Sequence, residues 1–154
     1  MSSFLKGEFK ALRYVFIVSH GMLAEGMHDA IKMLSGNESD EIQSLGLARD
    51  MGADEFAAKF RNMLKSVQPE DEIIMFADIV GGSPLSTAAN VIAEEGLLDK
   101  TLMIGGMNLA LVLTAVLSKD DMDFEEIKTD LLEEARSAMK VFAVETAAGN
   151  DDEI

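Results

Sequence analysis

His20 is the residue that most directly suggests chemistry in this chain. It follows an apolar run at residues 14–18, and Gly21 and a helix-like stretch come directly after it. A side chain in that position lies at the rim of a sheet, and neutral imidazole is a competent nucleophile near pH 7. The helix that follows would offer unpaired backbone amides and the positive end of its dipole to an anion. We therefore predict that His20 and Gly21 belong to an anion-binding reactive site.

Asp78 and the loop behind it would complete such a site. Asp78 follows a second apolar run at residues 73–77 and precedes Gly81-Gly82-Ser83-Pro84. A carboxylate that accepts one imidazole N–H fixes the tautomer and leaves the other nitrogen free to attack. Glycines let the backbone approach a phosphate closely, and the hydroxyl of Ser83 could donate to it. The same residues are also typical of a turn cap and an ordinary capped loop, but together with His20 they favour an anion pocket facing an imidazole.

The elements that must position these residues alternate along the chain. Apolar runs predict strands at residues 14–18, 41–47, 73–77 and 101–104. The run at 41–47 is a weaker strand candidate than the other three. Amphipathic spacing predicts helices at residues 23–34, 53–66, 85–95, 109–117 and 124–138, with Ser83 as N-cap and Pro84 as first residue of the third. Continuous apolarity indicates strands that are buried on both faces. The fold class is therefore α/β, a three-layer, doubly wound sheet with four parallel strands.

In an open sheet of this kind, functional groups collect beyond the carboxyl ends of the strands. That rule brings together three segments, at residues 19–21, 78–83 and 105–108. Gly105-Gly106 in the last segment could permit close approach of a ligand or only close a turn. The rule supports a shared site for His20 and Asp78.

The two ends of the chain differ from the domain between them. We expect an N-terminal arm at residues 1–13, one domain at 14–146 and an acidic tail at 147–154. Residues 139–144 are strand-like, and a terminal strand needs a sheet edge to satisfy its backbone groups. That strand could fold back onto its own sheet and leave a monomer, or it could pair with a second chain.

Composition excludes several classes of function. The 154 residues include 13 Lys and Arg against 28 Asp and Glu, a net charge of −15 that disfavours nucleic acids and anionic membranes and favours a basic protein partner. No apolar run reaches the ~18 residues of a membrane span, and the N-terminus has no signal-like apolar region. With no Cys and two His, a structural metal site is poorly supported, and His28 is expected on a solvent-exposed helix face. A cytoplasmic location fits these features.

Three motifs in this order resemble a known family. They are residues 19–25 (SHGMLAE), 76–84 (FADIVGGSP) and 105–108 (GGMN), and the likeness covers about residues 14–145. The chain resembles the enzyme IIA domain of the mannose/fructose/sorbose class of the bacterial phosphoenolpyruvate-dependent sugar phosphotransferase system.

The resemblance implies a phosphocarrier that needs neither metal nor cofactor. Phospho-HPr would phosphorylate His20, and the phosphoryl group would pass to a IIB component, with the membrane reached only indirectly through the IIC/IID transporter. Asp78 matches the orienting carboxylate, and Ser83 with the glycines beside it, including Gly81 and Gly82, matches the loop next to the phosphohistidine. Family members form homodimers in which the last strand crosses to the partner's sheet, and residues 139–144 match that antiparallel edge strand.

This chain departs from the best-known mannose members, which often continue through a linker into IIB. The IIB component is therefore expected to be a separate chain, and the N-terminal arm is extra. Two alternatives stay open: a phosphodonor component for a dihydroxyacetone kinase, and a non-catalytic regulator phosphorylated on His20. A receiver-like signalling domain is disfavoured, because it needs clustered carboxylates where Ser19-His20 stands.

Overall fold

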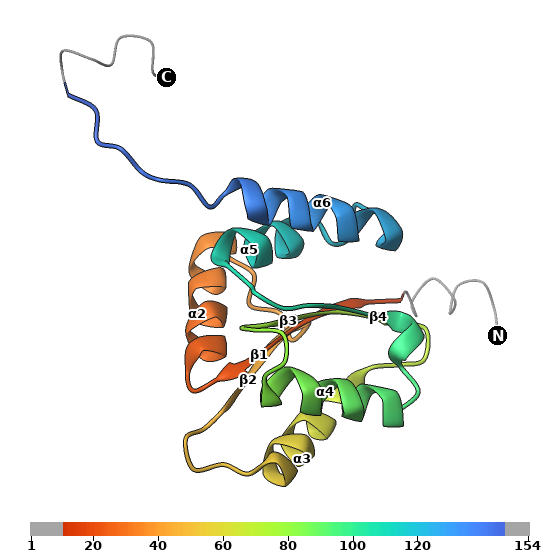
Figure 1. Cartoon of the computed structure of the whole chain (residues 1–154). Coiled ribbons are helices and arrows are strands. Elements are labelled where there is room, and N and C mark those ends of the chain that lie inside the picture. Colours follow the sequence, from red (N-terminus) through yellow and green to blue (C-terminus); the bar gives the residue numbers. More distant parts are fainter. Residues whose placement is uncertain (1–10, 147–154) are drawn as a thin grey trace, which may run out of the picture.

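A four-stranded parallel sheet forms the centre of the molecule (Figure 1). It is seen in a computed structural model that describes residues 11–146. The strands are β1 (Arg13–His20), β2 (Ile42–Leu47), β3 (Glu72–Ala77) and β4 (Thr101–Ile104), and their order across the sheet is β2-β1-β3-β4. The predicted fold class is confirmed, with β1 beginning one residue before the predicted run.

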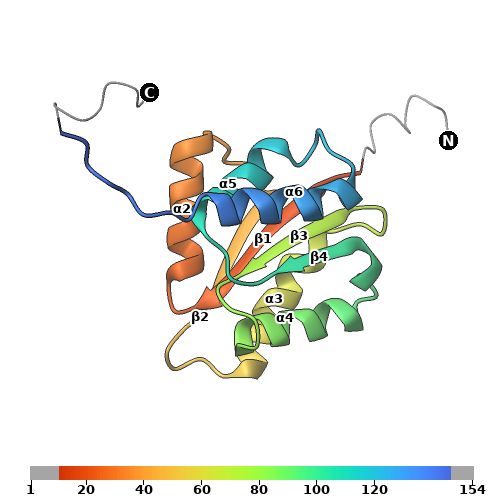
Figure 2. The same cartoon turned by 45° about the horizontal axis from the view of Figure 1, so that its top comes forward.

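Helices cover both faces of this sheet (Figures 1 and 2). One layer holds α2 (Leu23–Ser35), α5 (Leu109–Ser118) and α6 (Phe124–Ser137); the other holds α3 (Ala53–Met63) and α4 (Ser83–Glu94). Single 3-10 turns follow α3 and α4, at Leu64–Ser66 and Leu98–Lys100. The part of the chain that the structure describes contains no helix long and apolar enough to cross a membrane.

The two helix layers bury alternate side chains of the same strands. Val15 and Ile17 of β1 pack with α2, α5 and α6, whereas Phe16 and Val18 pack with α3 and α4. Successive strand side chains point to opposite faces, so a strand covered on both sides must be apolar throughout. This is why β1 and β3 are continuous apolar runs in the sequence.

The strand order reverses between β1 and β3. From β1 the chain moves outward through α2 to β2, then returns past β1 through α3 to β3 and continues to β4 on the other side. Open α/β sheets bind ligands at such a reversal of strand order, outside the carboxyl ends of the strands. His20 ends β1, and Asp78 directly follows β3.

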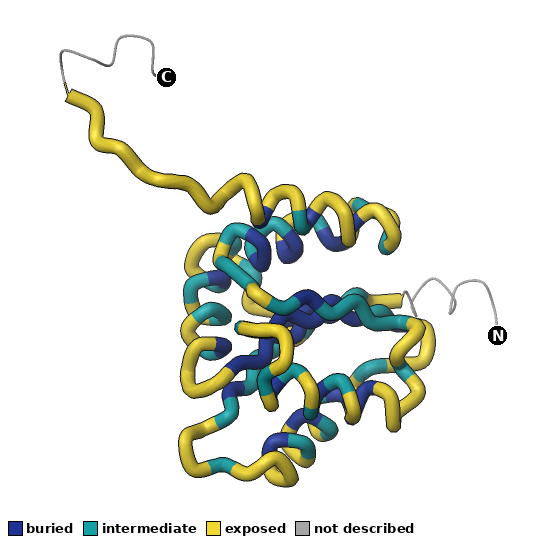
Figure 3. Tube along the Cα trace, in the orientation of Figure 1, coloured by how far each residue is buried: buried dark blue, intermediate teal, exposed yellow. Residues whose placement is uncertain are grey.

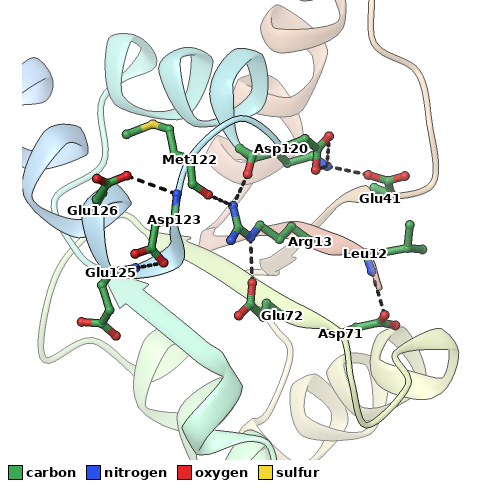
Figure 4. A network of polar contacts seen from close by, with 11 residues as sticks. Leu12, Arg13, Glu41, Asp71, Glu72, Asp120, Met122, Asp123, Glu125 and Glu126 are labelled. Atoms are coloured by element: carbon green, nitrogen blue, oxygen red, sulfur yellow. Dashed lines mark hydrogen bonds and ion pairs between the residues drawn. The ribbon is translucent and has the colours of Figure 1, made fainter. Parts of the chain in front are cut away.

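A polar network ties the opposite, amino-terminal edge of the sheet to the α5–α6 connection (Figure 4). Arg13 donates from Nε to Glu72 at 2.7 Å and from its terminal nitrogen to the carbonyls of Lys119 and Met122. The buried Lys119 pairs with Glu41 at 2.6 Å. This edge is occupied by structural ion pairs, which leaves the carboxyl-end edge for chemistry.

Two predicted local features differ from the structure. Residues 139–146 form no strand in the described chain; they extend away from α6 (Figure 3), with the side chains of Val141, Phe142 and Val144 80–94% exposed. A strand needs a neighbouring backbone, and among the described residues 11–146 no strand pairs with this segment. The N-cap of α4 is Gly82 instead of Ser83, which makes Ser83 the first helical residue. Residues 1–10 and the predicted acidic tail at 147–154 lie outside the described residues.

Candidate active site

His20 and Asp78 form a hydrogen-bonded pair at the carboxyl ends of β1 and β3. The ring Nδ1 of His20 lies 2.7 Å from Asp78 Oδ2, and the backbone N–H of His20 donates to the same oxygen at 2.9 Å. The side chain of His20 is 49% exposed, whereas that of Asp78 is 12% exposed. A carboxylate at Nδ1 holds the proton on that nitrogen and leaves the Nε2 lone pair free. The pair therefore has the geometry of an oriented nucleophile.

The environment of Asp78 favours its charged form. Burial alone would raise the pKa of this carboxyl, but hydrogen bonds from the backbone and ring of His20 and from the backbone N–H of Ile79 outweigh burial and lower the pKa. The Ile79 N–H donates to Oδ1 at 2.9 Å, so both carboxylate oxygens have donors. An ionised Asp78 can stabilise the positive charge that develops on the imidazole when Nε2 is substituted.

The turn after β1 is fixed from inside the fold. The buried hydroxyl of Ser19 accepts from the backbone N–H of Ala24 at 2.7 Å, in the first turn of α2. Gly21 adopts a φ of +55°, and its N–H donates to the carbonyl of Leu47 at 2.8 Å. These bonds tie the His20 turn to α2 and β2, so the imidazole projects from a rigid support.

The loop after β3 packs directly against the imidazole. A Cβ on Gly82 would lie 2.7 Å from His20 Cε1, so only glycine permits this approach. Gly81 has a φ of +91°, which allows the chain to turn from Asp78 into α4. The exposed Ser83 opens α4 beside the ring, and its hydroxyl bonds to no other residue within 11–146.

The segment at residues 105–108 supports this loop. A Cβ on Gly105 would lie 2.4 Å from Val80 Cγ2, and the N–H groups of Gly106 and Met107 donate to the carbonyls of Asp78 and Ala77. Asn108 caps α5 by accepting from Leu111 N–H at 2.8 Å. Of the two interpretations of Gly105-Gly106, the structure therefore supports turn closure.

Two further residues lie near the turn that follows β1. Arg49 lines, with His20 and Gly21, an open pocket of about 420 Å³ next to the imidazole. Glu25 accepts from the backbone N–H of Gly46 at 3.1 Å, while its other carboxylate oxygen is buried without a hydrogen-bond partner among the described residues.

A sequence model of the family described as "PTS system fructose IIA component" (EIIA-man) matches residues 14–132, which include the whole site. The chain belongs to this family. It is therefore a IIA component of the sugar phosphotransferase system, with a role in phosphoryl transfer. The resemblance stated from the motifs is confirmed.

Individual relatives agree with this assignment. This chain is 25% identical over 127 residues to the PTS system fructose-specific EIIA component of Bacillus subtilis (strain 168). The match covers 82% of this chain and 84% of the relative. This chain also matches the PTS IIA protein associated with the fucose utilization operon of Streptococcus pneumoniae, with a TM-score of 0.73, 25% identity, and coverage of 86% and 94% of the two chains.

A second solved structure supports the fold alone. The mannose/sorbose-specific IIA subunit from Enterococcus faecalis gives a TM-score of 0.74 at 21% identity, covering 87% of this chain and 97% of that one.

The structure of this IIA component brings together most residues predicted for its site. Asp78 and Gly82 lie against the imidazole of His20, and Ser83 follows Gly82 as the first residue of α4. The N–H of Gly21 is already used within its turn. Arg49 and the hydrogen bond from Gly46 to Glu25 were not predicted, because both depend on the pairing of β2 with β1.

His28 differs from its predicted exposure. It is half-buried, and its Nδ1 lies 2.9 Å from Ser44 Oγ. Burial, with help from the charge of Lys32 and against that of Asp29, lowers the pKa of His28. The described part of this IIA component gathers no group of three or more His, Cys, Asp or Glu residues that could hold a metal ion.

Proposed function

We propose that this chain is a cytoplasmic phosphocarrier that accepts a phosphoryl group from phospho-HPr on Nε2 of His20 and delivers it to a IIB component for sugar uptake. The observation that carries the proposal is the 2.7 Å contact between His20 Nδ1 and Asp78, on a ring that is 49% exposed. The contact directs the free lone pair of Nε2 outward, where a protein-bound phosphoryl group can reach it.

The transfer balances without an additional proton donor or acceptor. The Nε2 lone pair of His20 forms the new N–P bond while the N–P bond of the donor's phosphohistidine breaks, and the bonding electrons return to the donor ring. The donor ring leaves as neutral imidazole with the proton it carried, and His20 keeps its proton on Nδ1. The substituted ring gains positive charge, which Asp78 stabilises. Onward transfer to IIB is the same step with His20 as donor.

The loop after β3 supplies the surroundings that phosphoryl transfer requires. Transfer depends chiefly on in-line placement and on stabilising the charge of the equatorial oxygens. Gly82 brings the N-terminus of α4 beside the imidazole, and helix N-termini attract phosphate through their free amides. The hydroxyl of Ser83, at the first position of α4, can donate to the same group.

We also propose that the working form is a homodimer. Residues 139–144 carry exposed apolar side chains, with Phe142 85% and Val141 94% exposed in the single chain. Large apolar groups exposed together mark an interaction site, and β2 and β4 both present open edges in the described sheet. Exchange of this segment as an antiparallel edge strand would cover the side chains and satisfy the backbone of both partners.

The test is phosphorylation by phospho-HPr followed by addition of IIB. We expect acid-labile, alkali-stable phosphate on the wild-type chain and its onward transfer to IIB. His20→Ala should accept none and should remain folded, because truncating a half-exposed side chain opens no core cavity. His28→Gln is the matched control and should accept phosphate as the wild type does.

Two outcomes would contradict the proposal. Phosphate uptake by His20→Ala would remove His20 from the role of acceptor. Phosphorylation of His20 without transfer to any IIB would favour the regulator instead of the carrier.

A further inference from the structure

The pocket beside His20 contains a cation that the proposed transfer does not yet use. Its volume is about 420 Å³, and it is lined by His20, Gly21, Leu47, Ala48, Arg49 and Met51. Apart from the imidazole, Arg49 is the only charged group among these residues. The pocket is therefore an open, mainly apolar recess with one permanent positive charge next to the nucleophile.

The fold holds Arg49 near the imidazole through backbone contacts. His20 and Leu47 are paired in register at the ends of β1 and β2, and the Gly21 N–H donates to the Leu47 carbonyl at 2.8 Å. Arg49 follows two residues later, in a turn closed by the Met51 N–H on the Ala48 carbonyl at 3.0 Å. The backbone of Arg49 is thus fixed relative to the turn after β1, while its side chain is exposed.

Arg49 has no partner within residues 11–146. It forms neither a hydrogen bond nor an ion pair there, whereas Arg13 and Arg61 are both held by glutamates. The chain as a whole carries a net charge of −15, and Asp78 adds a carboxylate beside the ring. A phosphoryl group on Nε2 would add further negative charge beside Asp78. The unpaired guanidinium of Arg49 at the same pocket would offset that charge.

We propose that Arg49 binds the phosphoryl group on Nε2 of His20. A planar guanidinium matches two phosphoryl oxygens with two parallel hydrogen bonds, a geometry that lysine cannot reproduce. In this arrangement Asp78 stabilises the imidazole side of the N–P bond and Arg49 the oxygens. The inference rests on the proposed phosphorylation of His20 and adds a phosphoryl-binding residue to it.

The consequence is a stabilised phosphohistidine. Loss of a charge-assisted contact of this kind corresponds to about a tenfold change in an equilibrium or rate constant. We expect Arg49→Ala to shift the phosphorylation equilibrium with phospho-HPr about tenfold toward the donor. Arg49→Lys should lie between Arg49→Ala and the wild type, because it restores the charge without the fork.

The experiment uses two phosphoryl donors on the full chain. The first is phospho-HPr, and the second is phosphoramidate, which transfers its phosphoryl group to imidazole nitrogen with release of ammonia and needs no protein docking. Wild type, Arg49→Ala, Arg49→Lys and Lys128→Ala are compared for the rate and final extent of His20 phosphorylation. Lys128 lies exposed on α6 and matches the change in net charge.

We expect the phosphorylation of His20 to fall about tenfold in Arg49→Ala with both donors. Lys128→Ala should be phosphorylated as the wild type is. Equal behaviour of Arg49→Ala and the wild type, within twofold with both donors, would overturn the inference. A loss seen only with phospho-HPr would also overturn it, by showing that Arg49 contacts the donor protein instead. If phospho-HPr fails with the wild type while phosphoramidate still labels His20, the proposed function fails, and the phosphoramidate comparison still decides the role of Arg49.

Discussion

Replacing Gly82 with alanine tests how closely the β3–α4 loop must approach the imidazole. The added Cβ would lie 2.7 Å from His20 Cε1 and 3.2 Å and 3.3 Å from Ile79 Cγ1 and Cδ1. Carbon atoms prefer separations of about 3.5–4.0 Å, so the ring or the loop must move by about 1 Å. The ring is held by its 2.7 Å contact with Asp78, and the loop leads directly into α4. A misplacement of this size can slow a reaction by about a hundredfold.

The assay is the rate of phosphorylation by phospho-HPr, measured beside thermal unfolding. We expect Gly82→Ala to react about a hundred times more slowly while remaining folded. Gly26→Ala is the matched control, because a Cβ there would meet nothing within 4 Å and the residue lies within α2. A folded Gly82→Ala protein that reacts within twofold of the wild type would refute the close-approach argument.

Three further changes test the remaining parts of the account. Asp78→Asn should slow phosphorylation at least tenfold, because the amide lacks the stabilising charge. The pKa of Asp78 is lowered in the folded state, so its ionised carboxylate stabilises the folded chain. This stabilisation is complete above the usual aspartate pKa of 3.8 and is lost as the pH falls through the lowered pKa. Denaturant unfolding of both proteins between neutral and acidic pH should therefore show a difference in stability that shrinks in acid; a constant difference would contradict this. Glu25→Ala should lower the free energy of unfolding by about 1–3 kcal/mol, by leaving the buried Gly46 N–H without an acceptor, and Glu25→Gln by less. Equal unfolding midpoints for Glu25→Ala and the wild type would show that this bond contributes nothing. Deleting residues 139–154 should convert a sedimenting dimer into a monomer, whereas a full-length chain that is already monomeric at micromolar concentration would contradict the dimer.

Much of the fold could be predicted because its strands are buried on both sides. The runs at residues 14–18 and 73–77 have no polar alternation, which is typical of the central strands of a parallel sheet and became β1 and β3. Edge strand β2 is less completely buried and was correspondingly weaker in the sequence. The strand order could not be derived, because it depends on contacts between elements instead of on local pattern.

The C-terminal segment shows where local sequence pattern is insufficient to predict structure. Residues 139–144 have strand-forming side chains, but a strand also requires a partner backbone, and in the single chain they remain extended and exposed. Local propensity therefore favours a strand here, but the described chain forms none. The strand stays a prediction that depends on the proposed dimer.

The candidate site was likewise predictable only in part. His20 and Asp78 could be predicted because each directly follows a buried strand, and parallel strands end at one edge. Arg49 and the hydrogen bond from Gly46 to Glu25 could not, because both depend on the pairing of β2 with β1. Capping preference favoured Ser83 as N-cap, but Gly82 takes that position, and it is also the residue that packs against the imidazole.

The most direct test of the account is to identify the phosphorylated atom after reaction with phospho-HPr. Phosphorus-31 and nitrogen-15 NMR of the intact, phosphorylated chain distinguish the two histidines and the two ring nitrogens. The account predicts a single phosphohistidine at Nε2 of His20, with Nδ1 still protonated and bonded to Asp78. Phosphate on Nδ1 of His20, or on His28, would contradict it.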